Sequence, residues 1–168
     1  KTVNEPAVPA KKGYDGAWSK YELNFENIEV TAEYTFGKAA GFSVSLAGDI
    51  GLNFYATLSA DTDEMTAQVT FKGETVTVKG VKTDKVAGNA FVFRFPVAPK
   101  DYKENVAFVV TTLGGDTITA TSSVKEYADK FAEGEDGYEL VQKMLAYCEA
   151  ARVYFAAETV DTAKDFTA

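Results

Sequence analysis

Histidine is absent from this 168-residue chain, and cysteine occurs once. Histidine is the most frequent general base at neutral pH and the most frequent zinc ligand, so Ser–His–Asp sites, Cys–His sites and histidine-based metal sites are excluded. A single cysteine excludes an internal disulfide. We therefore expect no cofactor and no metal.

Positive charge and long apolar runs are also scarce. The chain has 17 Lys and Arg against 25 Asp and Glu, a formal net charge of −8. Such a surface repels phosphate backbones, which argues against nucleic acid as a partner. No apolar run approaches the length of about 20 residues that spans a bilayer, so we expect no membrane span. The chain starts with Lys1 and shows no signal peptide, and we expect it to be a fragment of a longer protein.

What is present is an alternation typical of strands, in a chain long enough to build a hydrophobic core. Predicted strands or hairpins cover residues 17–24, 28–36, 42–46, 50–58, 67–81, 91–97 and 106–123. The FEN segment, residues 25–27, would connect the first two strands, and GKAAG, residues 37–41, would be a linker. Turns are expected about Lys72–Gly73–Glu74 and Gly114–Gly115–Asp116, and Pro96 indicates a strand end or an edge.

Two of the predicted strands differ in how their faces are occupied. Residues 50–58 alternate, so that Asn53, Tyr55 and Thr57 should point away from the core. Residues 106–110, by contrast, are apolar on both faces, which predicts a covered central strand.

The last third of the chain changes to a helical period. Residues 123–134 predict a short helix with Ser122 or Ser123 as a possible N-cap and Gly134 beyond its end. Residues 137–157 predict a long amphipathic helix, which we expect to cover the open face of the sheet. Residues 158–168 would be a frayed tail or linker. Strands followed by helices favour a mainly β (α+β) fold, an antiparallel β-sandwich or sheet packed by two C-terminal helices.

The N-terminal segment resembles a known repeat. Residues 5–35 are similar to the second half of the Listeria–Bacteroides repeat, the internalin B-repeat-like module. The resemblance is carried by Pro6–Ala7–Val8–Pro9, Lys12–Gly13–Tyr14, Trp18 and the alternating strand that ends at Tyr34. Such repeats occur in arrays on secreted and cell-wall-attached bacterial proteins. The resemblance therefore implies an extracellular or cell-wall-associated location and a repeat-derived β-hairpin at residues 1–37.

A second resemblance covers residues 42–156. FSVSLAGDIGLNFYATL, SVKEYADKF and LVQKMLAYCEAARVYF are similar, in this order, to an uncharacterised module of multidomain surface proteins from Gram-positive gut anaerobes. This resemblance implies that the chain is one module of a multidomain surface protein, and it implies no particular chemical activity. We expect a partial repeat at 1–37, a β-rich domain with C-terminal helices at 42–157 and a tail or linker at 158–168, in a monomer whose partners are adjacent modules of the same polypeptide.

Aromatic residues supply the candidate ligand-binding positions. Tyr14 and Trp18 could stack on sugar rings, although large aromatics are usually mostly buried and a core role in the repeat is favoured. Tyr55 is the better platform, framed by Asn53 and Thr57, and the alternative, which we prefer, is a tyrosine covered by the C-terminal helix or a loop.

Other chemistry has weaker support. The acidic DTDE, residues 61–64, offers oxygen ligands for calcium but is better explained as a solvated turn. The remaining carboxylates are scattered and none lies at an inward strand position, while Cys148 falls on the apolar stripe of the last helix. We therefore expect a non-catalytic extracellular module that acts as a structural or spacer element. The alternative is a glycan-binding or host-adhesion module, motivated by an aromatic content of 13%.

Overall fold

The computed structural model describes residues 7–11, 15–18, 32–59, 64–111 and 116–164. It is mainly β, with three antiparallel sheets followed by a C-terminal helical region, which confirms the predicted α+β class. The predicted connection at residues 25–27 and most of the first predicted strand lie outside the described residues.

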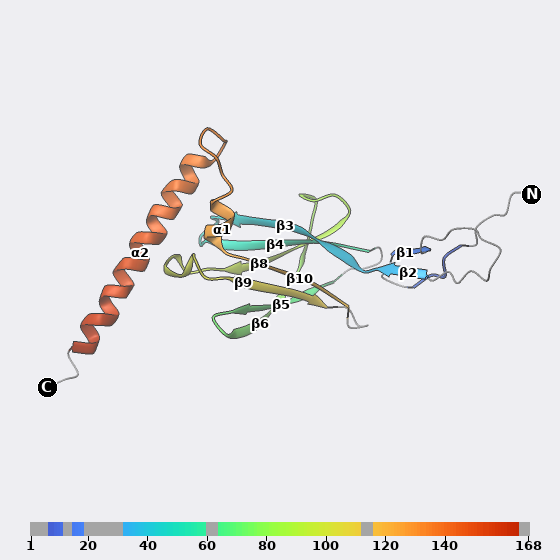
Figure 1. Cartoon of the computed structure of the whole chain (residues 1–168), viewed down its shortest axis with the longest axis horizontal. Coiled ribbons are helices and arrows are strands. Elements are labelled where there is room, and N and C mark those ends of the chain that lie inside the picture. Colours follow the sequence, from blue (N-terminus) through green and yellow to red (C-terminus); the bar gives the residue numbers. More distant parts are fainter. Residues whose placement is uncertain (1–6, 12–14, 19–31, 60–63, 112–115, 165–168) are drawn as a thin grey trace, which may run out of the picture.

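Two four-stranded sheets form the body of the molecule (Figure 1). Sheet I has the order β3-β4-β8-β7, with β3 at Gly37–Ser45, β4 at Gly51–Leu58, β8 at Asn89–Pro96 and β7 at Val81–Thr83. Sheet II has the order β10-β9-β5-β6, with β10 at Thr117–Ser122, β9 at Val106–Thr111, β5 at Thr66–Phe71 and β6 at Glu74–Lys79. A separate hairpin pairs β1, Asp15–Trp18, with β2, Ala32–Thr35.

The core lies between sheets I and II and is rich in phenylalanine. The ring of Phe54 in sheet I lies 5.4 Å from that of Phe108 in sheet II and 6.1 Å from that of Phe93. Phe42 contacts both Phe54 and Phe108. All but Phe42 are essentially inaccessible to solvent, so burial of these rings is a main source of stability.

Several elements lie where short patterns in the sequence predicted them. Lys72 and Gly73 form a two-residue turn between β5 and β6, and both have positive φ, 51° and 84°, as a tight antiparallel hairpin requires. Pro96 is the last residue of β8. β9 is indeed a central strand, although Ala107 and Val109 on its outer side are half-buried rather than covered.

The predicted linker at residues 37–41 is wrong, because these residues form the first part of β3. A β-carbon at Gly37 would lie 2.4 Å from the carbonyl oxygen of Thr57, so glycine permits a close approach of β3 to β4. Gly41 has a φ of 106° and follows the register shift after Ala39. The glycines that suggested a linker thus serve close pairing and a β-bulge.

The helices follow the sandwich. The first, α1, spans Val124–Ala128, and the Ser123 hydroxyl caps it by accepting a hydrogen bond of 3.0 Å from the Glu126 amide. The second, α2, spans Tyr138–Lys164 and so continues through residues 158–164, which had been expected to be a tail.

The prediction that the long helix covers a sheet face is wrong. Helix α2 packs mainly against α1 and a short 3₁₀ helix, η1 at Pro99–Asp101, at one end of the sandwich (Figure 1). The two sheets already cover each other's apolar faces, so the remaining apolar surface lies at this end. Met144 and Cys148 from α2 join the core there.

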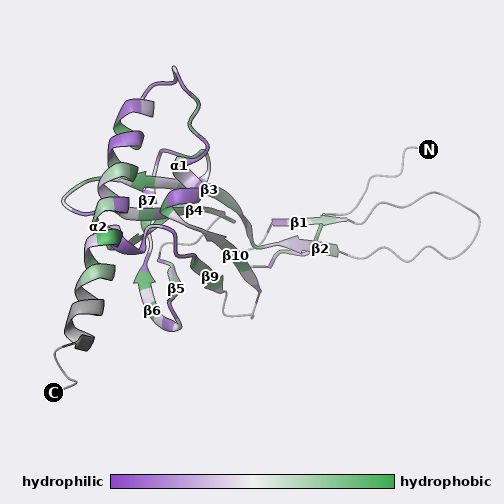
Figure 2. Cartoon of the chain, turned by 60° about the vertical axis from the view of Figure 1, so that its left-hand side comes forward, coloured by the Kyte–Doolittle hydropathy of each residue, from purple (hydrophilic) through white to green (hydrophobic). Residues whose placement is uncertain are grey.

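The β1–β2 hairpin lies at the opposite end of the sandwich from α2 (Figure 2). Ser59, just after β4, fastens its base: the buried Ser59 hydroxyl lies 2.7 Å from the carbonyl oxygen of Thr35 and 3.3 Å from a carboxylate oxygen of Asp15. Tyr34 donates a hydrogen bond of 2.8 Å to the carbonyl of Pro9, which holds the preceding segment against the hairpin.

Candidate functional site

Asn53, Tyr55 and Thr57 lie together on the outer face of sheet I, as β4 pairs with β3 and β8. Yet only 7% of Asn53 and 6% of Tyr55 is exposed, and Thr57 is half-buried. The hydroxyls of Ser43 and Tyr55 are 3.0 Å apart, and Asn53 Nδ2 donates to Ser43 Oγ at 3.1 Å. Tyr55 is therefore almost fully buried and cannot serve as an open platform. The alternative attributed such burial to the C-terminal helix or a loop, but α2 packs mainly against η1 and α1.

The other predicted platform is not joined to this group. Trp18 is half-buried in β1, where it pairs with Ala32 in the hairpin at one end of the molecule. Tyr14 lies outside the described residues. The structure thus brings together three of the five predicted ligand-binding residues, on a face where Asn53 and Tyr55 are already hydrogen-bonded.

Arg94 closes the same face near the β3–β4 turn. Its Nε donates to Ser45 Oγ at 3.0 Å, and its guanidinium forms an ion pair with Asp49, whose pKa it lowers chiefly through this hydrogen bond. A β-carbon at residue 51 would lie 2.5 Å from Arg94 Nε, so Gly51 provides the space in which the guanidinium lies. We call Ser43, Ser45, Asn53, Tyr55 and Arg94 the closed face.

The outer face of sheet II differs, and sequence reasoning missed it. Two registered rows cross its four strands. One row is Thr77, Gln68, Val109 and Thr119, and the other is Thr75, Thr70, Ala107 and Thr121. We call these eight residues the open face. The available signal is the outward alternation of polar residues in TAQVT, ETVTV and TITAT, which predicts strands but does not by itself indicate a site.

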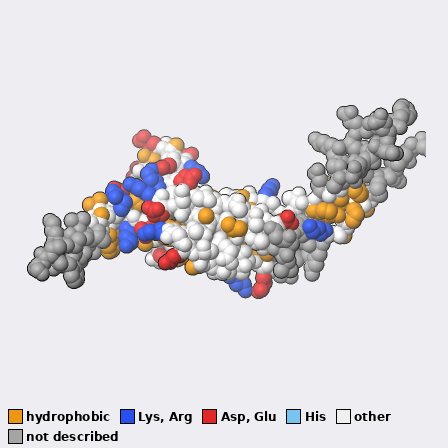
Figure 3. Space-filling view, turned by 60° about the horizontal axis from the view of Figure 1, so that its bottom comes forward, with side chains coloured by type: hydrophobic (Ala, Val, Ile, Leu, Met, Phe, Trp, Pro, Cys, Tyr) orange, Lys and Arg blue, Asp and Glu red, His pale blue; other side chains and the backbone are white. Residues whose placement is uncertain are grey.

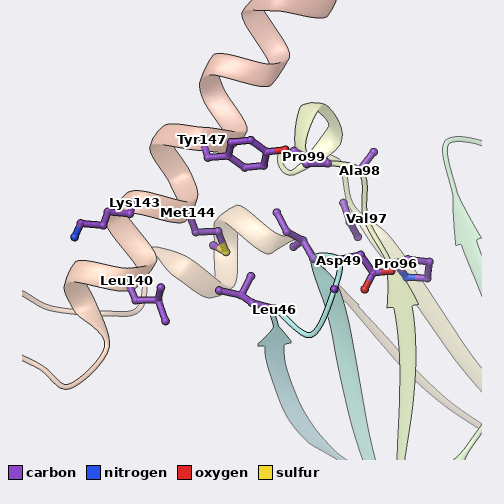
Figure 4. A pocket seen from close by; sticks show the side chains of 12 residues that line it. Leu46, Asp49, Pro96, Val97, Ala98, Pro99, Leu140, Lys143, Met144 and Tyr147 are labelled. Atoms are coloured by element: carbon purple, nitrogen blue, oxygen red, sulfur yellow. The ribbon is translucent and has the colours of Figure 1, made fainter.

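A cleft of about 640 Å³ separates α2 from the end of the sandwich (Figure 4). Its walls are mainly apolar: Leu46 lies opposite Leu140 and Met144, and the Tyr147 ring extends toward Pro99, whereas Lys143 points away. The one carboxylate that lines it, Asp49, is paired with Arg94. The cleft therefore offers apolar contact but no pair of groups suited to acid–base chemistry.

A polar cluster holds α2 against η1. Glu149 accepts hydrogen bonds from Tyr102 Oη at 2.8 Å and Arg152 Nη2 at 2.6 Å, and Lys103 Nζ lies 3.1 Å from it. The hydrogen bond from Arg152, followed by those from Tyr102 and Lys103, holds the Glu149 pKa well below its usual range. A carboxylate kept ionised by three donors is suited to fastening a helix and poorly suited to donating a proton.

Cys148 and the acidic loop bear on other chemistry. Burial raises the pKa of the Cys148 thiol, which disfavours the thiolate. The described part of the chain contains no group of three or more acidic or cysteine side chains placed to hold a metal ion. Of the DTDE segment, only Glu64 is described; it is exposed and pairs with Lys79 at 2.9 Å.

Comparisons with known proteins found no matching family model, no matching curated protein and no matching solved structure. In the described residues, no helix combines the length and the apolar character needed to cross a membrane.

Proposed function

We propose that this chain is a non-catalytic extracellular module of a bacterial multidomain cell-surface protein, and that it acts as a structural spacer. One observation carries the proposal: the β1–β2 hairpin and helix α2 leave the sandwich at opposite ends (Figure 1). The chain thus crosses the sandwich, and modules attached before and after it would be held apart by the length of the two sheets. Adjacent modules of the same polypeptide are its proposed partners.

The hairpin and α2, through which the chain leaves the sandwich, are both held to it by side-chain contacts. A spacer needs such contacts because it must keep its neighbouring modules in a fixed orientation. At one end, Ser59 contacts both Asp15 and Thr35 of the hairpin. At the other, Glu149 joins α2 to Tyr102 beside η1. These contacts limit rotation of the two exits against the sheets.

The chemistry of the side chains supports the non-catalytic part of the proposal. General acid–base catalysis needs groups whose pKa values lie near the working pH. Arg152 and Arg94 instead lower the pKa values of Glu149 and Asp49, away from neutrality, and burial raises that of Cys148. Histidine, which would titrate in that range, is absent from the sequence.

Distance measurement between spin labels at the two ends tests the spacer. In a Cys148→Ala background, labels at Ala17→Cys in β1 and Ala150→Cys in α2 should give one narrow distance distribution near that of the structure. A matched pair of labels, both on the sandwich at Lys38→Cys and Thr77→Cys, gives the width of the distance distribution that is expected for a rigid body. A broad distribution for the end-to-end pair alone, or a peak showing the two ends close together, would contradict the proposal.

A second candidate function, a glycan-binding or adhesion module, is favoured by one observation. The open face of sheet II presents hydroxyl and amide groups to solvent, whereas the closed face uses its own internally. Retention of the protein on immobilised glycans is the direct test, and the absence of retention on all of them would remove this candidate.

A further inference from the structure

We propose that the open face of sheet II binds a neutral polysaccharide, with Val109 and Ala107 as its floor and the flanking threonines as its hydrogen-bonding rim. This goes beyond the spacer function and develops the second candidate by naming a surface and a ligand class. It does not depend on how the ends of the molecule are held.

The shape of the open face follows from strand order. In the central strand β9, Ala107 and Val109 are half-buried and short. On either side lie polar residues that are exposed, Thr119 and Thr121 from β10 and Gln68 and Thr70 from β5. The result is a shallow apolar strip between two polar edges. With neighbouring strands about 4.8 Å apart, the four strands span about 14 Å, comparable to a short oligosaccharide.

The charge of the open face excludes several ligand classes. None of its eight residues is charged, although one residue in four of the chain is. Figure 3 shows a broad surface of mainly uncharged side chains on this side of the molecule, with charged ones toward its margins. Lys79, at the corner of the sheet, is paired with Glu64. An anionic ligand finds no cation here, and a net charge of −8 repels it, whereas a neutral ligand meets no such penalty.

The hydroxyls of the open face are arranged to recognise other hydroxyls. Gln68 Nε2 donates to Thr77 Oγ1 at 2.9 Å, and the hydroxyls of Thr70 and Thr75 are 2.9 Å apart. On the other edge, neither Thr119 nor Thr121 has a side-chain hydrogen bond to the part of the protein described. Each threonine hydroxyl both donates and accepts, as sugar hydroxyls do.

Threonine also lowers the entropic cost of binding. A β-branched side chain on a strand has few χ1 rotamers, so its hydroxyl is largely positioned before the ligand arrives. The aliphatic C–H face of a sugar ring can lie on Val109 and Ala107 while its hydroxyls reach the polar edges. This mode needs no exposed aromatic ring, so no stacking platform in the sequence marks it.

Affinity electrophoresis of the whole chain tests the proposal. The probes are neutral arabinoxylan, galactomannan, xyloglucan and amylopectin, with anionic polygalacturonate as comparator. We expect at least one neutral polysaccharide to retard the protein and polygalacturonate to leave its mobility unchanged. The double variant Thr119→Val and Thr121→Val removes two hydroxyls at constant shape, and should weaken the retarding interaction by about tenfold or more.

The matched control is Thr57→Val, the same exchange on the outer face of sheet I, which should retain full binding. Circular dichroism melting of each variant separates lost binding from lost folding, and a second double variant, Thr70→Val and Thr75→Val, tests the opposite edge if the first is unstable. Absence of retardation by every neutral probe would overturn the proposal, as would full retention by both double variants. So would self-association, seen by sedimentation and abolished by the same exchanges, since the occupant would then be a second copy. The spin-label distances would be unaffected by any of these results.

Discussion

The two outer faces of the sandwich draw on similar polar residues and treat them in opposite ways. On the closed face, two long side chains, Tyr55 and Arg94, reach across to the small Ser43 and Ser45 and engage their hydroxyls. On the open face every residue except Gln68 is short, and contacts such as that of Thr70 with Thr75 link only adjacent strands. Side-chain length, more than polarity, thus decides whether an outward face is satisfied internally or remains available to a ligand.

Of the variants that compare the two faces, Tyr55→Ala should cause the largest loss in the free energy of unfolding. This exchange removes a ring that is only 6% exposed, and we expect a loss of about 3 kcal/mol in the free energy of unfolding. The matched change on the open face, Val109→Ala, truncates a half-buried side chain and should cost clearly less. Urea denaturation measures both, and equal losses would break the distinction between the faces.

Ser43→Ala should have the next largest effect. The Ser43 hydroxyl serves both Tyr55 and Asn53, and its removal leaves two buried polar groups without that partner. A loss of about 1–3 kcal/mol in unfolding free energy is expected. Tyr55→Phe in the same background should then cost little more, because its hydroxyl has already lost that partner. An additive double variant would show that the two hydroxyls do not interact.

Thr121→Val should barely change stability. The residue is exposed on the edge strand β10, and valine has the same shape and a similar preference for strands. We expect a change within about 0.5 kcal/mol in urea denaturation. A larger loss would indicate that the Thr121 hydroxyl supports the fold, and would remove it from the set of groups available to a ligand.

The smallest expected effect is a difference in pH dependence. Arg94 lowers the pKa of Asp49, so the stabilisation by Asp49 is present above the ordinary carboxyl pKa of 3.8 and is lost as the pH falls through the lowered value. Asp49→Asn should therefore lower the melting temperature slightly at pH 7, and the gap from the parent protein should narrow toward pH 3. The open face contains no titratable side chain, so the effect of Thr121→Val should be the same at both pH values. If the difference in melting temperature between Asp49→Asn and the parent protein were the same at both pH values, the ion pair with Arg94 would not be the source of the stabilisation.

Local patterns in the sequence predicted much of the fold. Alternation indicated the strands, Ser123 was one of two predicted N-caps, and Lys72–Gly73 marked the turn between β5 and β6. These features depend on residues close together in the chain, for which short-range preferences decide the conformation.

Non-local packing explains what the sequence did not predict. Alternation placed Tyr55 on the outer side of its strand, but its burial depends on partners such as Ser43 that belong to another strand. The apolar stripe of α2 showed that the helix must pack, and gave no sign that Tyr102 beside η1 would receive it. In the same way, the open face became visible only when the registers of four strands aligned threonines that are distant in sequence.

The paths of β3 and β10 have a mechanical consequence. A β-carbon at Gly37, where β3 begins, would lie 3.1 Å from the side chain of Ile118 near the start of β10, so the two strands start at the same end of the sandwich. The hairpin precedes β3 at that end, and α1 follows β10 at the other (Figure 1). Tension between the hairpin and α2 would therefore pull β3 and β10 in opposite directions along their lengths. The backbone hydrogen bonds that join β3 to β4 and β10 to β9 would then be loaded in shear. Because all the hydrogen bonds of a strand pair share such a load, they would resist as a group instead of opening one after another.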